Sequence, residues 1–189
     1  MRILCGLGNP GNNYKLTRHN VGFRLIEQLV KNFSIDEYLS DEEKQVFKGE
    51  VEGVKCYLFK PLTYMNLSGI PLIKFLNFYK INREDLIVIH DELDIELGKI
   101  KIKFGGGNGG HKGLQSIDQS IGNNYKRLRI GIGHPGSKDL VDKYVLEKFE
   151  ENEESILNST FQSILGNLQY LLEGQDDLFL TKTLSGKKE

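Results

Sequence analysis

Apolar and polar residues along the chain follow two spacings, one typical of strands and one typical of helices. Runs that are apolar throughout or that alternate predict strands at 2–7, 46–52, 54–60, 86–90, 99–104 and 127–132. Helices are expected at 21–33, 67–79, 113–121, 139–148 and 153–173. Strands interleaved with helices, and a hairpin around Gly53, predict an α/β domain whose mixed β-sheet is flanked by helices.

Composition places the chain among ordinary globular proteins. Its 189 residues, 39% hydrophobic and 27% charged, suit a single domain over 1–189 with a frayed tail at 185–189. The formal net charge is −1, so a polyanionic partner must be held by a local basic patch. No apolar run approaches the roughly 18 residues that span a membrane, and the N-terminus lacks a signal-peptide pattern. Cys5 and Cys56 lie in strand-like runs and are expected to be reduced. We expect a cytoplasmic monomer without membrane association.

The first strand runs into a glycine loop. Gly6, Gly8 and Gly11 have the spacing G-x-G-x-x-G, which is found in dinucleotide-binding proteins. Such a site needs a helix to begin at the loop, whereas the polar segment NNYKLTRHN follows here. The sequence therefore favours a rigid turn without a nucleotide cofactor, although a nucleotide-dependent enzyme is kept as an alternative. Asn9 is the side chain left free for function, unless it only caps its own turn.

His19 and Asp91 are the candidate catalytic residues. His19 precedes a predicted helix, and Asp91 follows the buried strand 86–90, at the sheet edge where α/β proteins gather ligands. A carboxylate that holds one imidazole nitrogen leaves the other free to take a proton from water. The chain has no G-x-S-x-G motif and no cysteine in a predicted loop, so activated water is favoured over a covalent nucleophile.

The same segment offers potential metal ligands. His90, Asp91, Glu92 and Asp94 are close together, and His111 follows nearby. Their spacing matches neither H-E-x-x-H nor a Cys/His pattern. We expect no metal site, and metal dependence is kept as the rival hypothesis.

The segment YMNLSG supplies candidate substrate-binding residues. Asn66 precedes a predicted helix, so it either caps that helix or donates its amide to a carbonyl oxygen that gains charge. Tyr64 and Met65 offer apolar walls to a site, or pack in the core.

A second glycine-rich loop, GGGNGGHKG at 105–113, permits close approach of a bulky or phosphate-bearing ligand. His111 and Lys112 are its only long side chains and are candidate binding residues. Alternation on the flanking strands predicts one basic stripe, suited to phosphates or simply solvated, made of Lys101, Lys103, Arg127 and Arg129.

Several motifs, in order, resemble the bacterial-type peptidyl-tRNA hydrolase family along nearly the whole chain. They are GLGNPG with Tyr14 and TRHN, then TYMNLSG, HDELD, GGGNGGHKGL and RLRIGIGHPG. The resemblance implies a single α/β domain that needs no cofactor. It also implies hydrolysis of the ester between a peptide and the 3′ end of tRNA.

Residue roles follow from the same resemblance. It implies that His19 is the general base and that Asp91 orients it and stabilises the form able to accept a proton. Asn9 would distinguish N-blocked from unblocked aminoacyl-tRNA, and Asn66 would hold the substrate near the reacting carbonyl.

The resemblance also implies the contacts with tRNA. Tyr14 and Tyr64 would touch its 3′ terminus, and Lys103 and Arg129 would clamp the 5′ phosphate of the acceptor stem. Lys112 departs from the family pattern GGHNG, because an ammonium only donates where an amide donates and accepts. A non-catalytic RNA-binding domain that uses the same basic stripe remains the alternative function.

Overall fold

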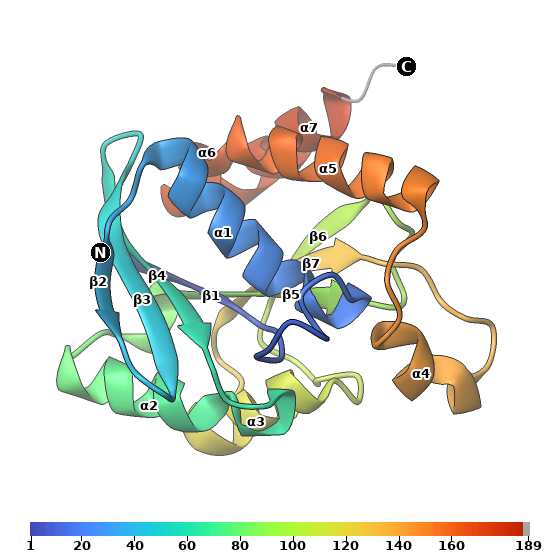
Figure 1. Cartoon of the computed structure of the whole chain (residues 1–189). Coiled ribbons are helices and arrows are strands. Elements are labelled where there is room, and N and C mark those ends of the chain that lie inside the picture. The colour runs from blue at the N-terminus through green and yellow to red at the C-terminus, as the bar shows by residue number, and fades with distance from the viewer. Residues whose placement is uncertain (187–189) are drawn as a thin grey trace.

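The structure, a computed structural model, describes residues 1–186 and contains one seven-stranded sheet. The strand order is β2-β3-β4-β1-β5-β7-β6 (Figure 1). The four central strands β4, β1, β5 and β7 run parallel, and β2, β3 and β6 are paired antiparallel. This confirms the predicted mixed sheet. The strands are β1 (Arg2–Gly6), β2 (Glu37–Ser40), β3 (Lys44–Val51), β4 (Val54–Pro61), β5 (Leu86–Glu92), β6 (Ile100–Phe104) and β7 (Lys126–Gly131).

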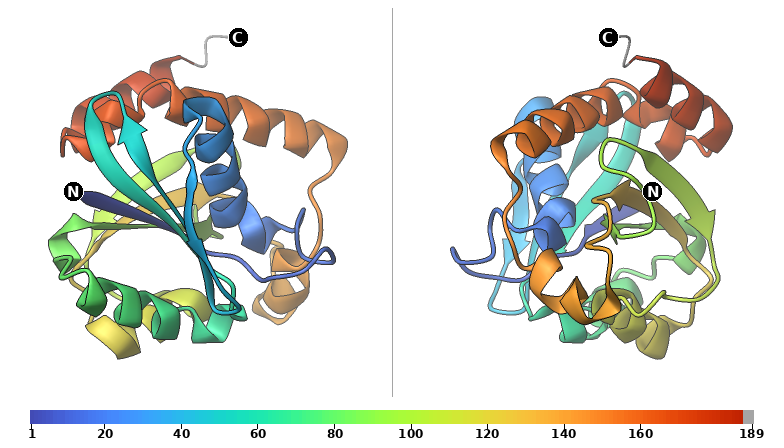
Figure 2. Two further views of the ribbon diagram at one scale, coloured as in Figure 1. Left: turned by 60° about the vertical axis from the view of Figure 1, so that its left-hand side comes forward. Right: turned by 90° about the vertical axis from the view of Figure 1, so that its right-hand side faces the viewer.

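Helices cover both faces of the sheet, as Figures 1 and 2 show. Helices α1, α5, α6 and α7 lie on one face, α2 and α3 lie on the other, and α4 stands at the end of the sheet. The helices are α1 (Val21–Phe33), α2 (Gly69–Phe78), α3 (Lys112–Ile121), α4 (Val141–Val145), α5 (Glu151–Leu165), α6 (Leu168–Leu172) and α7 (Asp176–Ser185). Four short 3₁₀ turns are η1 (Arg18–Asn20), η2 (Met65–Leu67), η3 (Arg83–Asp85) and η4 (Lys138–Leu140).

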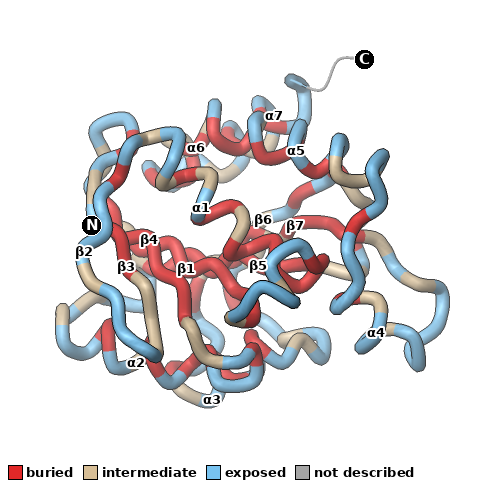
Figure 3. Tube along the Cα trace, in the orientation of Figure 1, coloured by how far each residue is buried: buried red, intermediate tan, exposed pale blue. Residues whose placement is uncertain are grey.

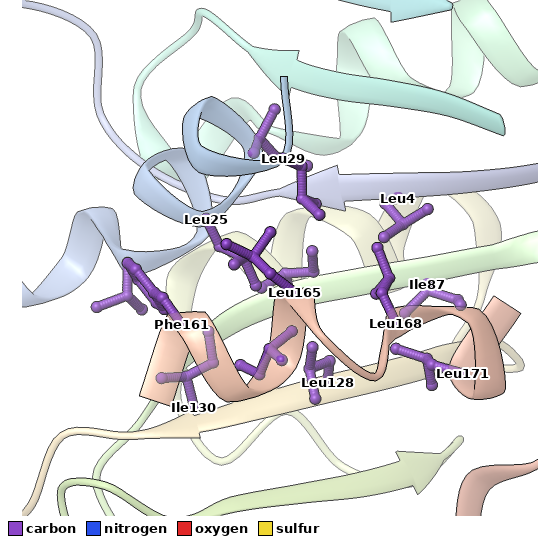
Figure 4. Close-up of a cluster of buried hydrophobic side chains, with 14 of the residues drawn as sticks. Leu4, Leu25, Leu29, Ile87, Leu128, Ile130, Phe161, Leu165, Leu168 and Leu171 are labelled. Atoms are coloured by element: carbon purple, nitrogen blue, oxygen red, sulfur yellow. The ribbon is translucent and has the colours of Figure 1, made fainter. Parts of the chain in front are cut away.

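The central strands of the sheet are buried (Figure 3), and two apolar clusters, one on each face, form the core. The larger cluster joins the sheet to α1, α5 and α6, and includes Leu4, Leu25, Ile87, Leu128, Phe161 and Leu168 (Figure 4). The smaller cluster packs α2 and α3 on the opposite face. Central parallel strands buried on both sides explain why their sequences are continuously apolar.

The carboxyl-terminal region differs most from expectation. The prediction of a single helix at 153–173 is wrong, because α5 ends at Leu165 and a second helix, α6, begins at Leu168. At the break, the side-chain amide of Asn167 donates to the Ser163 carbonyl at 2.8 Å, which satisfies a helix-end acceptor. Strand β2 and helix α7 were not predicted; β2 is mostly exposed and therefore has no apolar alternation. Ser185 ends α7, and the rest of the tail expected at 185–189 beyond Gly186 lies outside the described residues.

Cys5 and Cys56 are free and buried, and burial raises the pKa of the Cys56 thiol to about 11. Within residues 1–186, no helix is long and apolar enough to cross a membrane.

The topology places both sequence candidates for catalysis at one sheet edge. Strand β1 lies between β4 and β5, and the loop after β1 leaves the sheet beside the carboxyl end of β5. Ligands gather at such a switch point in α/β sheets. Close packing holds the loop there, since a Cβ on Gly8 would come within 2.6 Å of the Phe23 ring on α1.

Candidate active site

A cavity of about 520 Å³ opens at this edge of the sheet. It is lined by eight residues expected from the sequence, namely Asn9, His19, Tyr64, Met65, Asn66, Asp91, His111 and Lys112. One side of the lining comes from α4 and the residue after it, with Val141, Asp142, Val145 and Leu146. The cavity therefore joins segments from five separate parts of the chain.

The His19–Asp91 pair expected from the sequence is formed. Asp91 is the penultimate residue of strand β5 and does not follow the strand as expected. His19 lies in η1, immediately before α1. His19 Nδ1 is 2.8 Å from Asp91 Oδ2, and the two residues are 8% and 3% exposed. Because a carboxylate oxygen accepts, Nδ1 carries the proton and Nε2 keeps its lone pair. This is the form of histidine that can take a proton from water.

A second imidazole shares the same carboxylate, which the sequence did not reveal. His111 Nε2 is 2.8 Å from Asp91 Oδ1. The other ring nitrogen, Nδ1, accepts from the backbone N–H groups of Gly113 and Leu114 at 3.1 and 3.3 Å, and so caps helix α3. An acceptor Nδ1 places the proton of neutral His111 on Nε2. Each Asp91 oxygen therefore receives one imidazole N–H.

The electrostatic setting keeps Asp91 ionised. Burial alone would raise its pKa, but the electrostatic interactions and hydrogen bonds with the two imidazole rings outweigh that effect and lower the pKa well below the usual range. A carboxylate at this position fixes the tautomer of His19 that carries its proton on Nδ1.

His90, adjacent to Asp91 along β5, contacts both Asp91 and His111. Its Nδ1 donates to the Asp91 carbonyl at 2.7 Å, and its ring meets the His111 ring edge-on at 5.1 Å. Its Nε2 is buried and has no hydrogen-bond partner among residues 1–186. Mainly because it is buried, the pKa of His90 is lowered to about 3, so this ring is neutral.

Potential metal ligands also occur among these side chains. Within the described residues, one trio of potential ligands lies together, His19, Asp91 and His111, with ligand atoms within 4.8 Å of one another. A metal on His111 Nε2 would force a neutral ring to carry its proton on Nδ1, facing two backbone N–H donors. A metal-bound histidine normally donates its other N–H to an acceptor. The arrangement suits a carboxylate shared by two N–H groups better than a metal ion.

Asn9 and Asn66 take different positions in the cavity. Asn9 is 7% exposed, and its Oδ1 accepts the backbone N–H of Met65 at 2.8 Å, so it does not simply cap its own turn. Asn66 lies in η2 and is exposed. Its side chain does not cap α2, and it has no hydrogen-bond partner among the described residues. Its amide is therefore available to a ligand.

The rim of the cavity carries both an aromatic side chain and an ion pair. Tyr64 is 58% exposed, and its ring meets that of Tyr14 edge-on at 6.4 Å. Lys112 Nζ lies 3.6 Å from an Asp142 carboxylate oxygen on α4, and both side chains are more than half exposed. Tyr14 itself lies beside the cavity without lining it.

The basic stripe predicted from alternation is only partly correct. Antiparallel pairing of β6 and β7 places Lys101 opposite Arg129 and Lys103 opposite Arg127, on one face. Arg127 does not belong to an exposed stripe, because it is 2% exposed. Its guanidinium donates to the Gly106 and Gly107 carbonyls and to Asp118 on α3. Arg127 therefore supports the glycine loop from inside.

Lys103 and Arg129 lie outside the cavity lining. The Arg129 guanidinium faces Glu92, with Nε and Nη2 at 3.0 and 2.9 Å from one carboxylate oxygen. Its Nη1 has no partner among the described residues. The sequence did not identify Glu92 as the partner of Arg129. The only signal for it is its place in the charged segment HDELD.

Arg18 was also missed in the sequence. It is buried beside His19, and its Nη2 is 2.8 Å from Glu153 on α5. Its guanidinium lies over the Tyr144 ring of α4 at 4.2 Å. This buried arginine, next to the candidate base, thus connects η1 to the wall of the cavity. In the sequence, the only indication of its importance is its position beside His19 in TRHN.

A cavity with a buried histidine–carboxylate pair at its floor places this α/β protein among candidates for general-base enzymes. The protein-family model for peptidyl-tRNA hydrolase matches residues 3–188. Peptidyl-tRNA hydrolase of Bartonella quintana (strain Toulouse) is 42% identical over 180 residues, covering 95% of this chain and 93% of that protein. The Bartonella henselae protein of the same name is 40% identical, covering 100% of this chain and 97% of that one.

Solved structures agree. The crystal structure of peptidyl-tRNA hydrolase from Acinetobacter baumannii superposes with a TM-score of 0.91 at 41% identity, covering 98% of this chain and 95% of that one. The chain belongs to the peptidyl-tRNA hydrolase family. The non-catalytic RNA-binding alternative is not favoured, because the matched proteins are enzymes by name.

Proposed function

We propose that this chain cleaves the ester bond between a peptide and the 3′ end of tRNA, with water activated by His19 as the nucleophile. The observation that carries the proposal is the 2.8 Å contact of His19 Nδ1 with Asp91 at the floor of the cavity. It leaves Nε2 as the proton acceptor. The contribution of such a base is typically about 10²- to 10⁴-fold in rate.

The proton moves through His19 in two steps. Nε2 takes a proton from water as the water oxygen attacks the ester carbonyl carbon. The bond between that carbon and the ribose 3′ oxygen then breaks, and the imidazolium returns the proton to the departing oxygen. The Asp91 carboxylate stabilises the imidazolium between these steps, and His111 holds the carboxylate from its other side.

Cavity residues around this pair bind the peptide end. The free Asn66 amide donates to the carbonyl oxygen as it gains charge, an effect worth about 3 kcal/mol when buried. Met65 is 4% exposed and forms an apolar wall beside it. Asn9 distinguishes N-blocked from unblocked substrates, because a peptide presents an amide where a free amino acid presents an ammonium.

The exposed residues around the cavity bind the tRNA. Tyr64 and Tyr14 offer ring faces on which the bases of the 3′ terminus stack. Lys103 and Arg129 bind the 5′ phosphate of the acceptor stem, and Arg129 uses its free Nη1 or exchanges Glu92 for phosphate. Lys112 adds a cation at the rim where the family pattern has an amide.

The protein acts as a monomer in the cytoplasm under this proposal. Within the described chain, one cavity holds all the proposed catalytic groups, so no second copy is needed to complete it. Sedimentation of the purified protein at working concentration tests this, and a dimer mass would contradict it.

The first experiment measures release of labelled peptide from N-acetyl-aminoacyl-tRNA in the presence of EDTA. Wild type is compared with His19→Ala and with His134→Ala, a matched control in which an exposed histidine outside the cavity is removed. We expect rapid release by wild type and by the control, and loss of release in His19→Ala.

Two other results would contradict the proposal. Binding without release by wild type would make the chain an RNA-binding module. Release that EDTA abolishes would move the chemistry to a metal near the HDELD segment.

A further inference from the structure

A second asparagine, Asn20, pairs with the backbone of Asn9. The Asn20 side-chain Nδ2 donates to the Asn9 carbonyl at 2.9 Å, and its Oδ1 accepts the Asn9 backbone N–H at 2.9 Å. Asn20 is 2% exposed, so both bonds are shielded from water. One side chain therefore satisfies both backbone groups of a residue eleven positions away.

The orientation of the Asn9 amide is determined by a third buried bond. Its Oδ1 accepts the Met65 N–H at 2.8 Å. A rotated amide would place its NH₂ group against that N–H, donor facing donor. Nδ2 is consequently the polar atom that Asn9 can offer to the cavity.

Asn20 itself is held by the start of α1. A Cβ on Gly22 would overlap the Leu7 backbone nitrogen and the Ile89 carbonyl oxygen, so helix and sheet touch backbone to backbone at this point. His19 and Asn20 are adjacent in η1. The same rigid element thus places the base and, through Asn20, the Asn9 loop.

A donor at Asn9 has a chemical consequence for selectivity. The acyl carbonyl of an N-blocked substrate accepts a hydrogen bond from Nδ2. The ammonium of an unblocked aminoacyl ester can only donate, so it gains no bond there and faces a donor. Selectivity then depends on where Nδ2 points, which Asn20 and Met65 decide together.

We propose that Asn20 is a positioning residue for substrate discrimination: by holding the Asn9 backbone, it aims the Asn9 donor at the acyl group of N-blocked substrates. This inference rests on the proposed function. It assigns to Asn20 an effect on selectivity that is separate from the basicity of His19.

The test compares kcat/KM for N-acetyl-aminoacyl-tRNA with kcat/KM for the same aminoacyl-tRNA without the acetyl group. Asn20→Ala removes both bonds to Asn9, and we expect the ratio of the two values to fall about tenfold or more. The pH dependence of kcat for the acetylated substrate keeps its wild-type shape, because the His19–Asp91 contact does not involve Asn20.

A second variant keeps the test valid if the first unfolds. Asn20→Asp has the same shape, but as a carboxylate it turns an oxygen toward the Asn9 carbonyl. The protonated carboxyl can donate again, so discrimination should be low at neutral pH and recover as the pH is lowered. Wild type should show no such recovery.

Asn167→Ala is the matched structural control, since it removes a side-chain hydrogen bond to the Ser163 carbonyl far from the cavity. It should lower the unfolding midpoint without changing the ratio. The inference is overturned if the Asn20 variants lose stability but keep the wild-type ratio, or if Asn20→Ala changes the pH dependence of kcat. If wild type releases no peptide, the proposed function fails, which is a separate outcome.

Discussion

The floor and the rim of the cavity are built in opposite ways. The floor (Asn9, His19, Asp91 and His111) consists of side chains held by bonds of 2.8 Å to partners far away in sequence. The rim (Tyr64, Lys112, Asp142 and Leu146) consists of side chains at least 45% exposed, with one ion pair at 3.6 Å across it.

Under the proposed function, the contrast separates groups for chemistry from groups for recognition. Groups that stabilise charge in a reaction act best when they are preorganised and shielded, because no reorganisation is then needed. An exposed ion pair such as Lys112–Asp142 contributes only about 0–1 kcal/mol. Changes at the floor should therefore alter kcat by orders of magnitude, and changes at the rim should alter KM slightly.

The largest expected effect is that of Asp91→Asn. An amide oxygen can accept from His19 or from His111 but not from both, and its NH₂ group would face the remaining imidazole N–H. We expect kcat to fall by about 10²- to 10⁴-fold. Asp94→Asn, an exposed neighbour in the same segment, is the control and should retain wild-type kcat. Activity of Asp91→Asn within threefold of wild type would remove the carboxylate from the mechanism.

Arg129→Gln should come next, because it removes a cation outside the floor. We expect KM for the tRNA substrate to rise about tenfold. The slope of log kcat/KM against log salt should become shallower by about 1, as one phosphate contact is lost.

Arg127→Gln provides the contrast within the same strand. It removes the buried guanidinium from two loop carbonyls and from Asp118, which keeps its other hydrogen bonds, so the free energy of unfolding should fall by about 3 kcal/mol with the salt slope unchanged. A salt slope that responds to Arg127 and not to Arg129 would reverse the assignment.

His90, which packs beside Asp91 and His111, should contribute to the pH dependence of the free energy of unfolding. The pKa of His90 is lowered to about 3 when folded, against an ordinary value near 6.5, so on acidification the unfolded chain binds a proton first. Stability is therefore lost as the pH falls from 6 to 4, by about 1 kcal/mol per pH unit from this residue. Urea unfolding of wild type and His90→Phe at several pH values checks this.

Asp91 does not interfere in that window. Its pKa is lowered, so its stabilising contribution is present above its unfolded value of 3.8 and is lost only at lower pH. If the stabilities of wild type and His90→Phe change in parallel between pH 6 and 4, His90 is not neutral in the folded protein.

The smallest effect is expected at the rim. Lys112→Asn restores an amide that both donates and accepts, and we expect KM to fall about two- to threefold with kcat unchanged. The gain should be larger at high salt, where attraction of the ammonium to phosphate is screened. Asp142→Asn frees Lys112 and serves as the companion variant. An unchanged KM with unchanged salt dependence would show that Lys112 is a solvated side chain.

The sequence by itself determined the class of fold and the main candidates for the site. Continuously apolar runs predict central strands such as β1 and β5, because those strands are buried on both faces. His19 and Asp91 follow from their place beside a predicted helix and at a strand end. Such patterns are local, and they can be read without knowing which segments meet.

Only the tertiary structure decided which candidates work together. Alternation put Arg127 and Arg129 on the same face, but the glycine loop and Asp118 cover Arg127, whereas Arg129 meets Glu92. Likewise, no spacing showed that His111 and His19 share Asp91 or that Asn20 holds Asn9. Periodicity specifies the face of an element on which a side chain lies. What covers that face depends on segments distant in sequence, and burial and hydrogen-bond partners are determined there.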